Sequence, residues 1–206
     1  MRIYGSPGCG KTHYLTNEVL PKLTGKIAVL SFTKSGATEI AKRATTPVEF
    51  VGTIHKFAKD KCGIMGFQIV DEDTLSDFLQ IFGGNEIARK AIDSYQIERN
   101  TGLKSSGTST VIYQSVINKY EDYKERNGLY DFTDMLVEAA NSDWQDPIHH
   151  FDYVVVDEAQ DLTPLQWRVV NNITCTKELI VAGDDDQAIF EWAGAEALGM
   201  SKVEGE

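Results

Sequence analysis

The sequence predicts an α/β fold in which a central parallel sheet is flanked by helices. Three observations lead to this prediction. Short apolar runs of strand-forming residues recur along the chain and alternate with helical patterns, as they do in βα units. These runs are continuously apolar rather than alternating, which is typical of strands covered on both faces. A glycine-rich loop directly follows the first run and precedes a helical pattern.

Five segments are predicted to be strands. They are residues 2–4, 27–32, 48–51, 153–156 and 178–182. The first, second, fourth and fifth lead into a polar or glycine-bearing loop and then a helical pattern. Because ligands of parallel sheets gather beyond the carboxyl ends of the strands, we expect the functional residues in these loops.

Residues 61–127 are predicted to form a mostly helical insertion, and the α/β domain then comprises residues 1–60 and 128–206. Apolar side chains at helical spacing support two helices in the insertion. They are Leu75, Phe78, Leu79 and Phe82 in one helix and Ile112, Val116, Tyr120 and Tyr123 in the other. The second helix is expected to close at Asn127-Gly128, and residues 101–110 form a loop rich in Gly, Ser and Thr.

Two further helices carry capping signals. Asp131 is placed as the N-cap ahead of the apolar residues 135–137. Thr163 begins the other helix, with Pro164 at its first position and Gln166 completing a capping box.

Composition and charge restrict the class of protein. With 42% hydrophobic and 25% charged residues and three widely spaced cysteines, the chain is expected to be a globular, reduced, cytoplasmic protein without a membrane segment. The net charge of −11 argues against a nucleic-acid partner at first sight. The charge is unevenly spread, however: residues 1–60 carry +5, residues 61–150 carry −7 and residues 151–206 carry −9. The positively charged first segment could therefore bind an anion.

The loop Gly5-Ser6-Pro7-Gly8-Cys9-Gly10-Lys11-Thr12 matches the phosphate-binding pattern G-x-x-x-x-G-K-[ST]. Glycines permit the tight turn that points successive amides at one phosphate at the start of a helix. Lys11 is expected to reach the β- and γ-phosphates, and the Thr12 hydroxyl to ligate Mg²⁺. Cys9 is interpreted as a small spacer.

Asp157 and Glu158 follow an apolar strand and supply what a phosphate loop needs from elsewhere. Asp157 is expected to hold Mg²⁺, and Glu158 to orient or deprotonate the attacking water. Without other signals, two adjacent carboxylates at a strand end could instead belong to a solvated turn or a helix N-cap. The upstream phosphate loop favours the nucleotide site.

Beyond the phosphate loop, further segments resemble, in the expected order, the motifs of UvrD/Rep-type superfamily 1 DNA helicases. They are SFTK at 31–34, GTIH at 52–55, DFTDML at 131–136, DEAQDL at 157–162 and VAGDDDQAIFEWAGA at 181–195. The resemblance covers the first RecA-like domain of that family, a P-loop NTPase fold, and its helical insertion. It implies ATP and Mg²⁺ as cofactors and single-stranded DNA as a partner.

The resemblance also implies residue roles. Gln187 would sense the γ-phosphate, and Phe190 and Trp192 would stack on DNA bases, with burial as the alternative for both aromatic rings. The DNA backbone would be contacted by Thr33, Lys34, Thr53 and His55. The acidic run at residues 184–186 is interpreted as a loop that leads to Gln187, without a metal role.

Departures from the family pattern carry expectations of their own. The upstream glutamine segment that recognises adenine is missing, and Ala193 stands where relatives usually carry arginine. Nothing after Ala195 resembles the later motifs, so a second RecA-like domain is expected in the full-length protein. Because that domain supplies catalytic arginines, this chain, expected to be monomeric, should hydrolyse ATP poorly alone.

Two other functions remain open. One is a naturally short protein that uses nucleotide to gate DNA or partner binding without motor activity. The other is a small-molecule kinase, since a phosphate loop also opens many kinase chains. Residues 157–160 and 183–192 speak against the kinase, because they resemble a stacking platform rather than an acceptor pocket.

Overall fold

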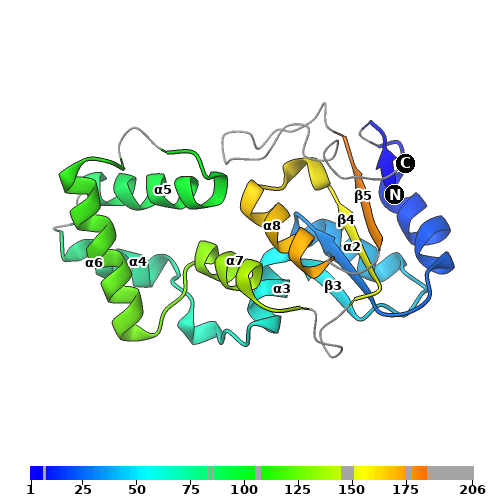
Figure 1. The fold of residues 1–206 in the computed structure, drawn as a ribbon, viewed down its shortest axis with the longest axis horizontal. Coiled ribbons are helices and arrows are strands. Elements are labelled where there is room, and N and C mark those ends of the chain that lie inside the picture. The colour runs from blue at the N-terminus through cyan, green and yellow to red at the C-terminus, as the bar shows by residue number, and fades with distance from the viewer. Residues whose placement is uncertain are drawn as a thin grey trace.

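A computed structural model describes residues 1–6, 8–82, 84, 86–104, 108–144, 151–174 and 178–184. Within these ranges five strands form one sheet in the order β1-β5-β4-β2-β3, and every neighbouring pair is parallel (Figure 1). The strands are β1 (Arg2–Tyr4), β2 (Ile27–Ser31), β3 (Phe50–Thr53), β4 (Tyr153–Asp157) and β5 (Glu178–Gly183). The predicted α/β fold with a parallel sheet is confirmed.

β3 lies two residues further along the chain than predicted. Its register with β2 runs from the pair Ala28 and Phe50 to the pair Ser31 and Thr53. Gly52, a poor strand former, occupies the strand because a Cβ atom there would lie 2.7 Å from the Phe50 ring. The apolar run at residues 48–51 placed the strand too early, because the packing of Gly52 against the Phe50 ring cannot be read from the sequence.

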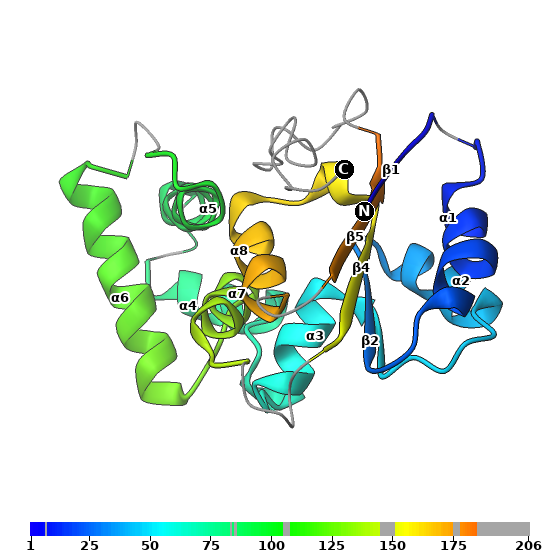
Figure 2. The same cartoon turned by 45° about the vertical axis from the view of Figure 1, so that its right-hand side comes forward.

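Helices cover both faces of the sheet (Figure 2). One face carries α1 (Lys11–Tyr14), the π-helical turn η1 (Leu15–Val19), the 3₁₀ turn η2 (Leu20–Lys22) and α2 (Lys34–Arg43). The other carries α3 (Ile54–Lys61), α7 (Phe132–Asn141) and α8 (Pro164–Ile173).

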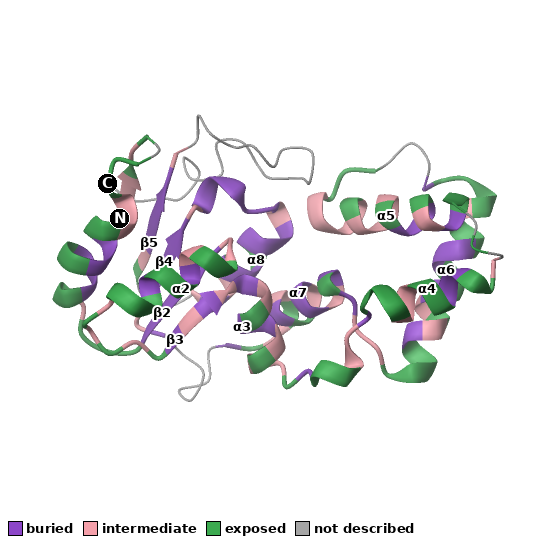
Figure 3. Cartoon of the chain, turned by 180° about the vertical axis from the view of Figure 1, so that it is seen from behind, coloured by how far each residue is buried: buried purple, intermediate pink, exposed green. Residues whose placement is uncertain are grey.

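Alternate residues of the central strands supply the two cores. Val29 and Val155 pack with Leu15 and Ile40 on the face of α1 and α2. Leu30 and Val156 pack with Phe57, Leu136 and Val170 on the opposite face. The central strands β2 and β4 therefore carry apolar residues toward both faces up to their carboxyl ends, as the sequence indicated, and the buried colour in Figure 3 runs through the sheet.

The capping predictions in this part of the fold are confirmed. Asp131 caps α7, where its side chain accepts a hydrogen bond from the Asp134 amide. Thr163 caps α8, and Gln166 completes the capping box with Pro164 at the first helical position.

The remaining helices, α4 (Glu72–Gln80), α5 (Glu86–Thr101) and α6 (Val111–Asn127), build a third and separate core. Phe78 lies at its centre, with its ring centroid 5.3 Å from that of Tyr120. α6 closes at Asn127, and Gly128 follows with φ 62°. Ile112, expected on the packed face, is instead 63% exposed. The division into a domain and an insertion stays a prediction, and this separate core supports it.

A buried ion cluster joins these helices to the start of α7. The ammonium group of Lys124, with 3% of its side chain exposed, donates to Asp131 at 2.7 Å and to Asp134 at 2.6 Å. Arg99 of α5 also pairs with both carboxylates. Burial opposes the charge of Asp131, but the cations prevail and hold its pKa below the usual value. None of the described helices combines the length and apolarity needed to cross a membrane.

Candidate functional site

The predicted site residues lie together at the carboxyl ends of the parallel strands. Ser31 at the end of β2 lies level with Asp157 of β4 and with Thr53 of β3. At the other side of the sheet, Tyr4 at the end of β1 lies level with Gly183 of β5. The loops that follow these strands therefore share one side of the molecule, as expected for a parallel sheet.

The glycine loop connects β1 to α1. Gly8 and Gly10 adopt positive φ angles of 72° and 90°, which other residues rarely adopt, and Gly10 is the N-cap of the helix. At Gly5 a Cβ atom would overlap the sulfur of Cys9. The close approach of Cys9 to the backbone agrees with its interpretation as a small spacer. Pro7 lies outside the described residues.

Lys11 is the first residue of the helix that follows the loop. Its ammonium group turns back into the loop and donates to the Gly5 carbonyl at 2.6 Å and to the Ser6 carbonyl at 3.3 Å. The cation thus lies over the same loop whose amides are suited to hold an anion. The helix passes into the π-helical turn η1, where the Thr16 hydroxyl donates to the carbonyls of Thr12 and His13.

Thr12 and Asp157 connect the loop to β4. The Thr12 hydroxyl donates to Asp157 Oδ2 at 3.0 Å. Asp157 is buried, which disfavours its charge, and neighbouring Glu158 adds repulsion. Together these effects raise the pKa of Asp157 from 3.8 to about 6, although the bond from Thr12 opposes the rise.

The second oxygen of Asp157 points to a missing electropositive partner. Among the described residues Oδ1 is buried and receives no hydrogen bond. A buried carboxylate beside a threonine hydroxyl is a donor set of hard oxygens, which suits Mg²⁺. Asp157 and Thr12 therefore fit the metal that was predicted for them.

Another acidic group does not fit a metal. Ligand atoms of Glu121, Asp131 and Asp134 lie within 4.8 Å of one another. Lys124, however, makes ion pairs with all three carboxylates, so their charge is already matched by a cation. We assign this group to the ion cluster that anchors α7.

Glu158 directly follows β4 and has a constrained backbone. Its φ of 55° makes it the one residue other than glycine with a positive φ in the described part of the chain. This conformation is costly for a glutamate and turns the chain sharply at the strand end. The carboxylate accepts a hydrogen bond from Gln160 Nε2 at 2.8 Å. Glu158 thus lies next to Asp157 with its side chain held.

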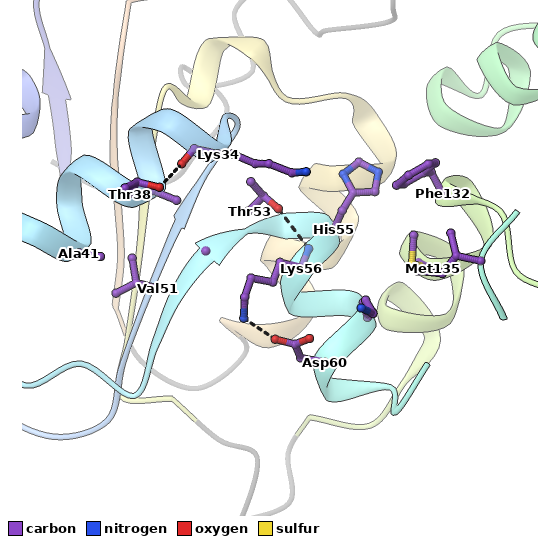
Figure 4. A pocket seen from close by; sticks show the side chains of 14 residues that line it. Lys34, Thr38, Ala41, Val51, Thr53, His55, Lys56, Asp60, Phe132 and Met135 are labelled. Atoms are coloured by element: carbon purple, nitrogen blue, oxygen red, sulfur yellow. Dashed lines mark hydrogen bonds and ion pairs between the residues drawn. The ribbon is translucent and has the colours of Figure 1, made fainter. Parts of the chain in front are cut away.

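A second feature of this side of the sheet is a groove of about 600 Å³ between α2 and α3 (Figure 4). Three lysines line it, Lys34 from α2 and Lys56 and Lys59 from α3, against one carboxylate, Asp60. The groove continues to Phe132 and Met135 of α7. Its lining is therefore basic along one part and apolar along another.

Both threonines predicted to contact DNA cap the helices that border this groove. Thr33 accepts a hydrogen bond from the Gly36 amide at 3.0 Å, and Thr53 accepts one from the Lys56 amide at 3.1 Å. The Thr53 hydroxyl still has a proton to donate, whereas the Thr33 hydroxyl also shares a 3.2 Å hydrogen bond with the Ser35 hydroxyl. Of these two caps Thr53 lines the groove, and α2 contributes its first residue, Lys34, whereas Thr33 is not among the lining residues.

His55 lies in the same groove and packs edge-on against Phe132, with ring centroids 5.7 Å apart (Figure 4). Burial lowers the pKa of His55 from 6.5 to about 4, so the ring is neutral at pH 7. It can donate a hydrogen bond but adds no positive charge. Phe132, in contrast, is 58% exposed at the first position of α7.

The structure adds residues that sequence reasoning missed. Phe132 and the lysines at 56 and 59 line the groove, and Gln160 contacts Glu158. An exposed aromatic directly after the N-cap Asp131 was a signal for Phe132, and the lysines contributed to the positive first segment. Nothing in the sequence signalled the contact of Gln160. Gln187, Phe190 and Trp192 lie outside the described residues, so their roles stay predictions.

Comparison with known proteins gives a consistent result. The profile of the UvrD/REP helicase N-terminal domain matches residues 84–206. The chain is 24% identical to DNA helicase II of Haemophilus influenzae over 97% of its length. It is 27% identical to the ATP-dependent DNA helicase PcrA of Staphylococcus aureus over 98% of its length. A probable DNA helicase II homolog of Mycoplasma genitalium is 24% identical over 94% of the chain.

These matches cover only a part of each relative. The chain spans 34% of the Haemophilus and Mycoplasma proteins and 33% of the Staphylococcus protein. It corresponds to about a third of the length of these curated relatives.

Proposed function

This chain belongs to the UvrD/REP helicase N-terminal domain family, and from that premise we propose that it forms the ATP-hydrolysing, DNA-binding first half of a DNA helicase motor. The observation that carries the proposal is the contact between Thr12 and Asp157, which joins the glycine loop to the strand-end carboxylates. The basic groove between α2 and α3, at the carboxyl ends of β2 and β3, supplies a place for DNA. Relatives named as DNA helicases support both parts.

ATP and Mg²⁺ are the cofactors of the proposed reaction. The loop from Gly5 to Thr12 holds the phosphates through its amides, and Lys11 exchanges its bonds to loop carbonyls for bonds to the β- and γ-phosphates. Thr12 and Asp157 hold the metal. Bound Mg²⁺ neutralises charge that develops on the transferring phosphoryl group.

Glu158 acts as the residue that aims and deprotonates water. Its carboxylate lies next to Asp157 and is held by Gln160, so that it can face the terminal phosphate rather than coordinate the metal. Gln187, predicted to sense that phosphate, belongs to the chain that follows β5. A second RecA-like domain in the full-length protein supplies arginines, and the isolated chain therefore turns ATP over slowly.

Single-stranded DNA occupies the groove between α2 and α3. Lys34, Lys56 and Lys59 neutralise phosphates, and the starts of the two helices provide amides and the hydroxyls of Thr33 and Thr53. His55 donates a neutral hydrogen bond, and Phe132 provides an exposed ring on which a base can stack. Phe190 and Trp192 are predicted to extend the stacking surface.

One alternative keeps the same sites without a motor. In it, nucleotide binding would gate DNA or partner binding by a protein that hydrolyses no ATP. A small-molecule kinase receives little support, because the groove between α2 and α3 is lined with lysines as well as apolar side chains and is not a closed acceptor pocket.

Measurement of ATP binding and phosphate release, with and without an oligothymidylate, tests the proposal. We expect Lys11→Ala to lose nucleotide binding. Glu158→Gln should keep binding and lose hydrolysis by a factor on the order of 100 or more. Lys22 is exposed, and among the described residues it pairs only with Glu18. Lys22→Ala therefore serves as the control for the loss of a lysine outside the site.

Three outcomes would separate the alternatives. Hydrolysis by Glu158→Gln at the unmodified rate would overturn the role of Glu158. Nucleotide-dependent DNA affinity without any phosphate release would favour the gated binding protein. Transfer of phosphate to a nucleoside, with no effect of DNA, would restore the kinase.

A further inference from the structure

Gln160 lies in the 3₁₀ turn η4 (Ala159–Asp161), directly after Glu158, and is 5% exposed. We propose that Gln160 is a positioning residue, which fixes the carboxylate of Glu158 and ties it to the backbone at the end of β5. The inference rests on the proposed function, because it concerns the residue assigned to activate water.

Both ends of the Gln160 amide are engaged. Its Nε2 donates to Glu158 Oε2 at 2.8 Å and, more weakly, to Asp161 Oδ2 at 3.3 Å. Its Oε1 accepts from the backbone amide of Asp184 at 3.1 Å. One buried side chain therefore connects Glu158 with a point 24 positions beyond Gln160 in the sequence.

The chemistry of the position favours glutamine over its isosteres. Only a side-chain amide offers a donor for a carboxylate and an acceptor for a backbone N–H in the same planar group. A glutamate would add a negative charge next to Glu158 and Asp161, and a methionine would fill the space without either bond. Asparagine has the right groups but is too short by one methylene to span both partners.

The place of Asp184 gives this connection a consequence. β5 lies between β1 and β4 in the sheet, so Asp184, directly after β5, lies between the end of the strand that leads into the glycine loop and the end of the strand that leads into Glu158. The residues that follow are those predicted to sense the γ-phosphate and to stack on DNA. A displacement of the backbone at Asp184 therefore moves the Gln160 side chain and with it the Glu158 carboxylate. In the reverse direction, nucleotide bound next to Glu158 changes the position of the Asp184 backbone.

The test compares Gln160→Met with the unmodified chain by amide hydrogen exchange and NMR shifts, together with ATP hydrolysis. In Gln160→Met we expect exchange at the Asp184 amide to rise roughly 3- to 10-fold. Mg-ATP should shift the Gly10 and Thr12 amides as before, but its effect on Asp184 should be lost. We expect kcat to fall about 10- to 100-fold with KM changed by less than about threefold, because geometry rather than binding is lost.

Gln166→Met is the matched control. Gln166 is also 5% exposed and also bonds backbone, at Thr163, but contacts neither Glu158 nor Asp184. It should leave the Asp184 amide and kcat unchanged. If Gln160→Met does not fold, Gln160→Asn provides the same comparison with a polar side chain.

The possible results separate this inference from the proposed function. Unchanged Asp184 exchange and unchanged kcat in Gln160→Met, with glycine-loop amides that respond to Mg-ATP, would overturn the positioning role alone. An equal loss of kcat in Gln166→Met would also overturn it, because general loosening would then explain the effect. Glycine-loop amides that ignore Mg-ATP in the unmodified chain would overturn the proposed function and this inference with it.

Discussion

Thr12 and Asp157 are 145 positions apart in the sequence, yet the Thr12 hydroxyl donates a 3.0 Å hydrogen bond to the Asp157 carboxylate. Thr12 is the second residue of α1, the helix after β1, and Asp157 ends β4, so β5 separates their strands in the sheet. The contact defines the point at which metal and phosphate would meet. It also makes the hydroxyl and the carboxylate testable separately.

The first prediction concerns Thr12. Thr12→Ala removes the hydroxyl that is proposed to ligate Mg²⁺, so affinity for Mg-ATP should fall about tenfold or more. Affinity for ATP in the presence of a chelator should change little, because Lys11 and the loop amides remain. Isothermal titration with and without Mg²⁺ measures both. Thr12→Ser retains the hydroxyl and is the control; equal losses in Thr12→Ser and Thr12→Ala would exclude a metal role.

The second prediction concerns the pH dependence of stability. The pKa of Asp157 is raised from 3.8 to about 6 in the folded chain. The folded state therefore binds more protons than the unfolded state between these values. The stabilisation of the folded state by the protonated Asp157 side chain is fully present below pH 3.8 and is lost as the pH rises through about 6. This change amounts to about 3 kcal/mol in the free energy of unfolding.

Urea denaturation between pH 4 and pH 7, without Mg²⁺, measures this effect. Asp157→Asn has no charge to lose, so its stability should not show this fall and should exceed that of the unmodified chain near pH 7. Added Mg²⁺ should stabilise the unmodified chain at pH 7 and not the variant. Parallel pH profiles for the two proteins would mean that another group is responsible.

The third prediction separates charge from stacking in the groove. Lys34→Ala should reduce the slope of log affinity for single-stranded DNA against log salt by about 1. Phe132→Ala should instead weaken binding by about 1–3 kcal/mol and leave the slope unchanged. Fluorescence anisotropy with a labelled oligothymidylate at several salt concentrations measures both variants. Lys22 is exposed and is not among the groove-lining residues, so Lys22→Ala provides the control. An equal reduction of the slope in Lys22→Ala and Lys34→Ala would argue against a defined DNA path.

The fourth prediction concerns the buried cluster that anchors α7. Lys124→Met leaves the carboxylates of Asp131 and Asp134 with Arg99 as the one remaining cation among their described partners. We expect a loss of about 3–5 kcal/mol in the free energy of unfolding.

Arg126 is the matched control for this substitution. It lies on the same helix and pairs with Asp122 at 2.9 Å, but its side chain is 75% exposed. Arg126→Met should cost less than about 1 kcal/mol, as exposed pairs do. Similar losses in both variants, measured by chemical denaturation, would show that Lys124 is not specially placed.

The fold was largely predictable because strand and cap signals are local. Continuous apolar runs identified β2, β4 and β5, and the caps at Asp131 and Thr163 agree with the structure. β3 was misplaced by two residues because the role of Gly52 depends on the neighbouring Phe50 ring. Ile112 lies in a helix, as its spacing predicted. It is nevertheless exposed, because it stands in the first turn of α6.

The site divides in the same way. The glycine loop and the Asp157-Glu158 pair were visible because their chemistry requires fixed spacing. Thr33 and Thr53 were predicted as DNA contacts, which stays a prediction, and their capping bonds depend on where each helix begins. The neutral state of His55 and the contact of Gln160 with Asp184 arise only from burial and distant pairing, which spacing does not encode.

The edge position of β1 has a consequence for folding. In the described sheet its one neighbour is β5, and the chain's amino group bonds the Leu179 carbonyl across 178 positions. Closing so long a loop has a high entropic cost, so the pairing should form late, after β2, β3 and β4 have assembled. During synthesis the glycine loop leaves the ribosome before β5 does, and it gains this supporting strand late in folding. A nucleotide that binds it would thus stabilise the final step of folding and protect newly made chains from unfolding.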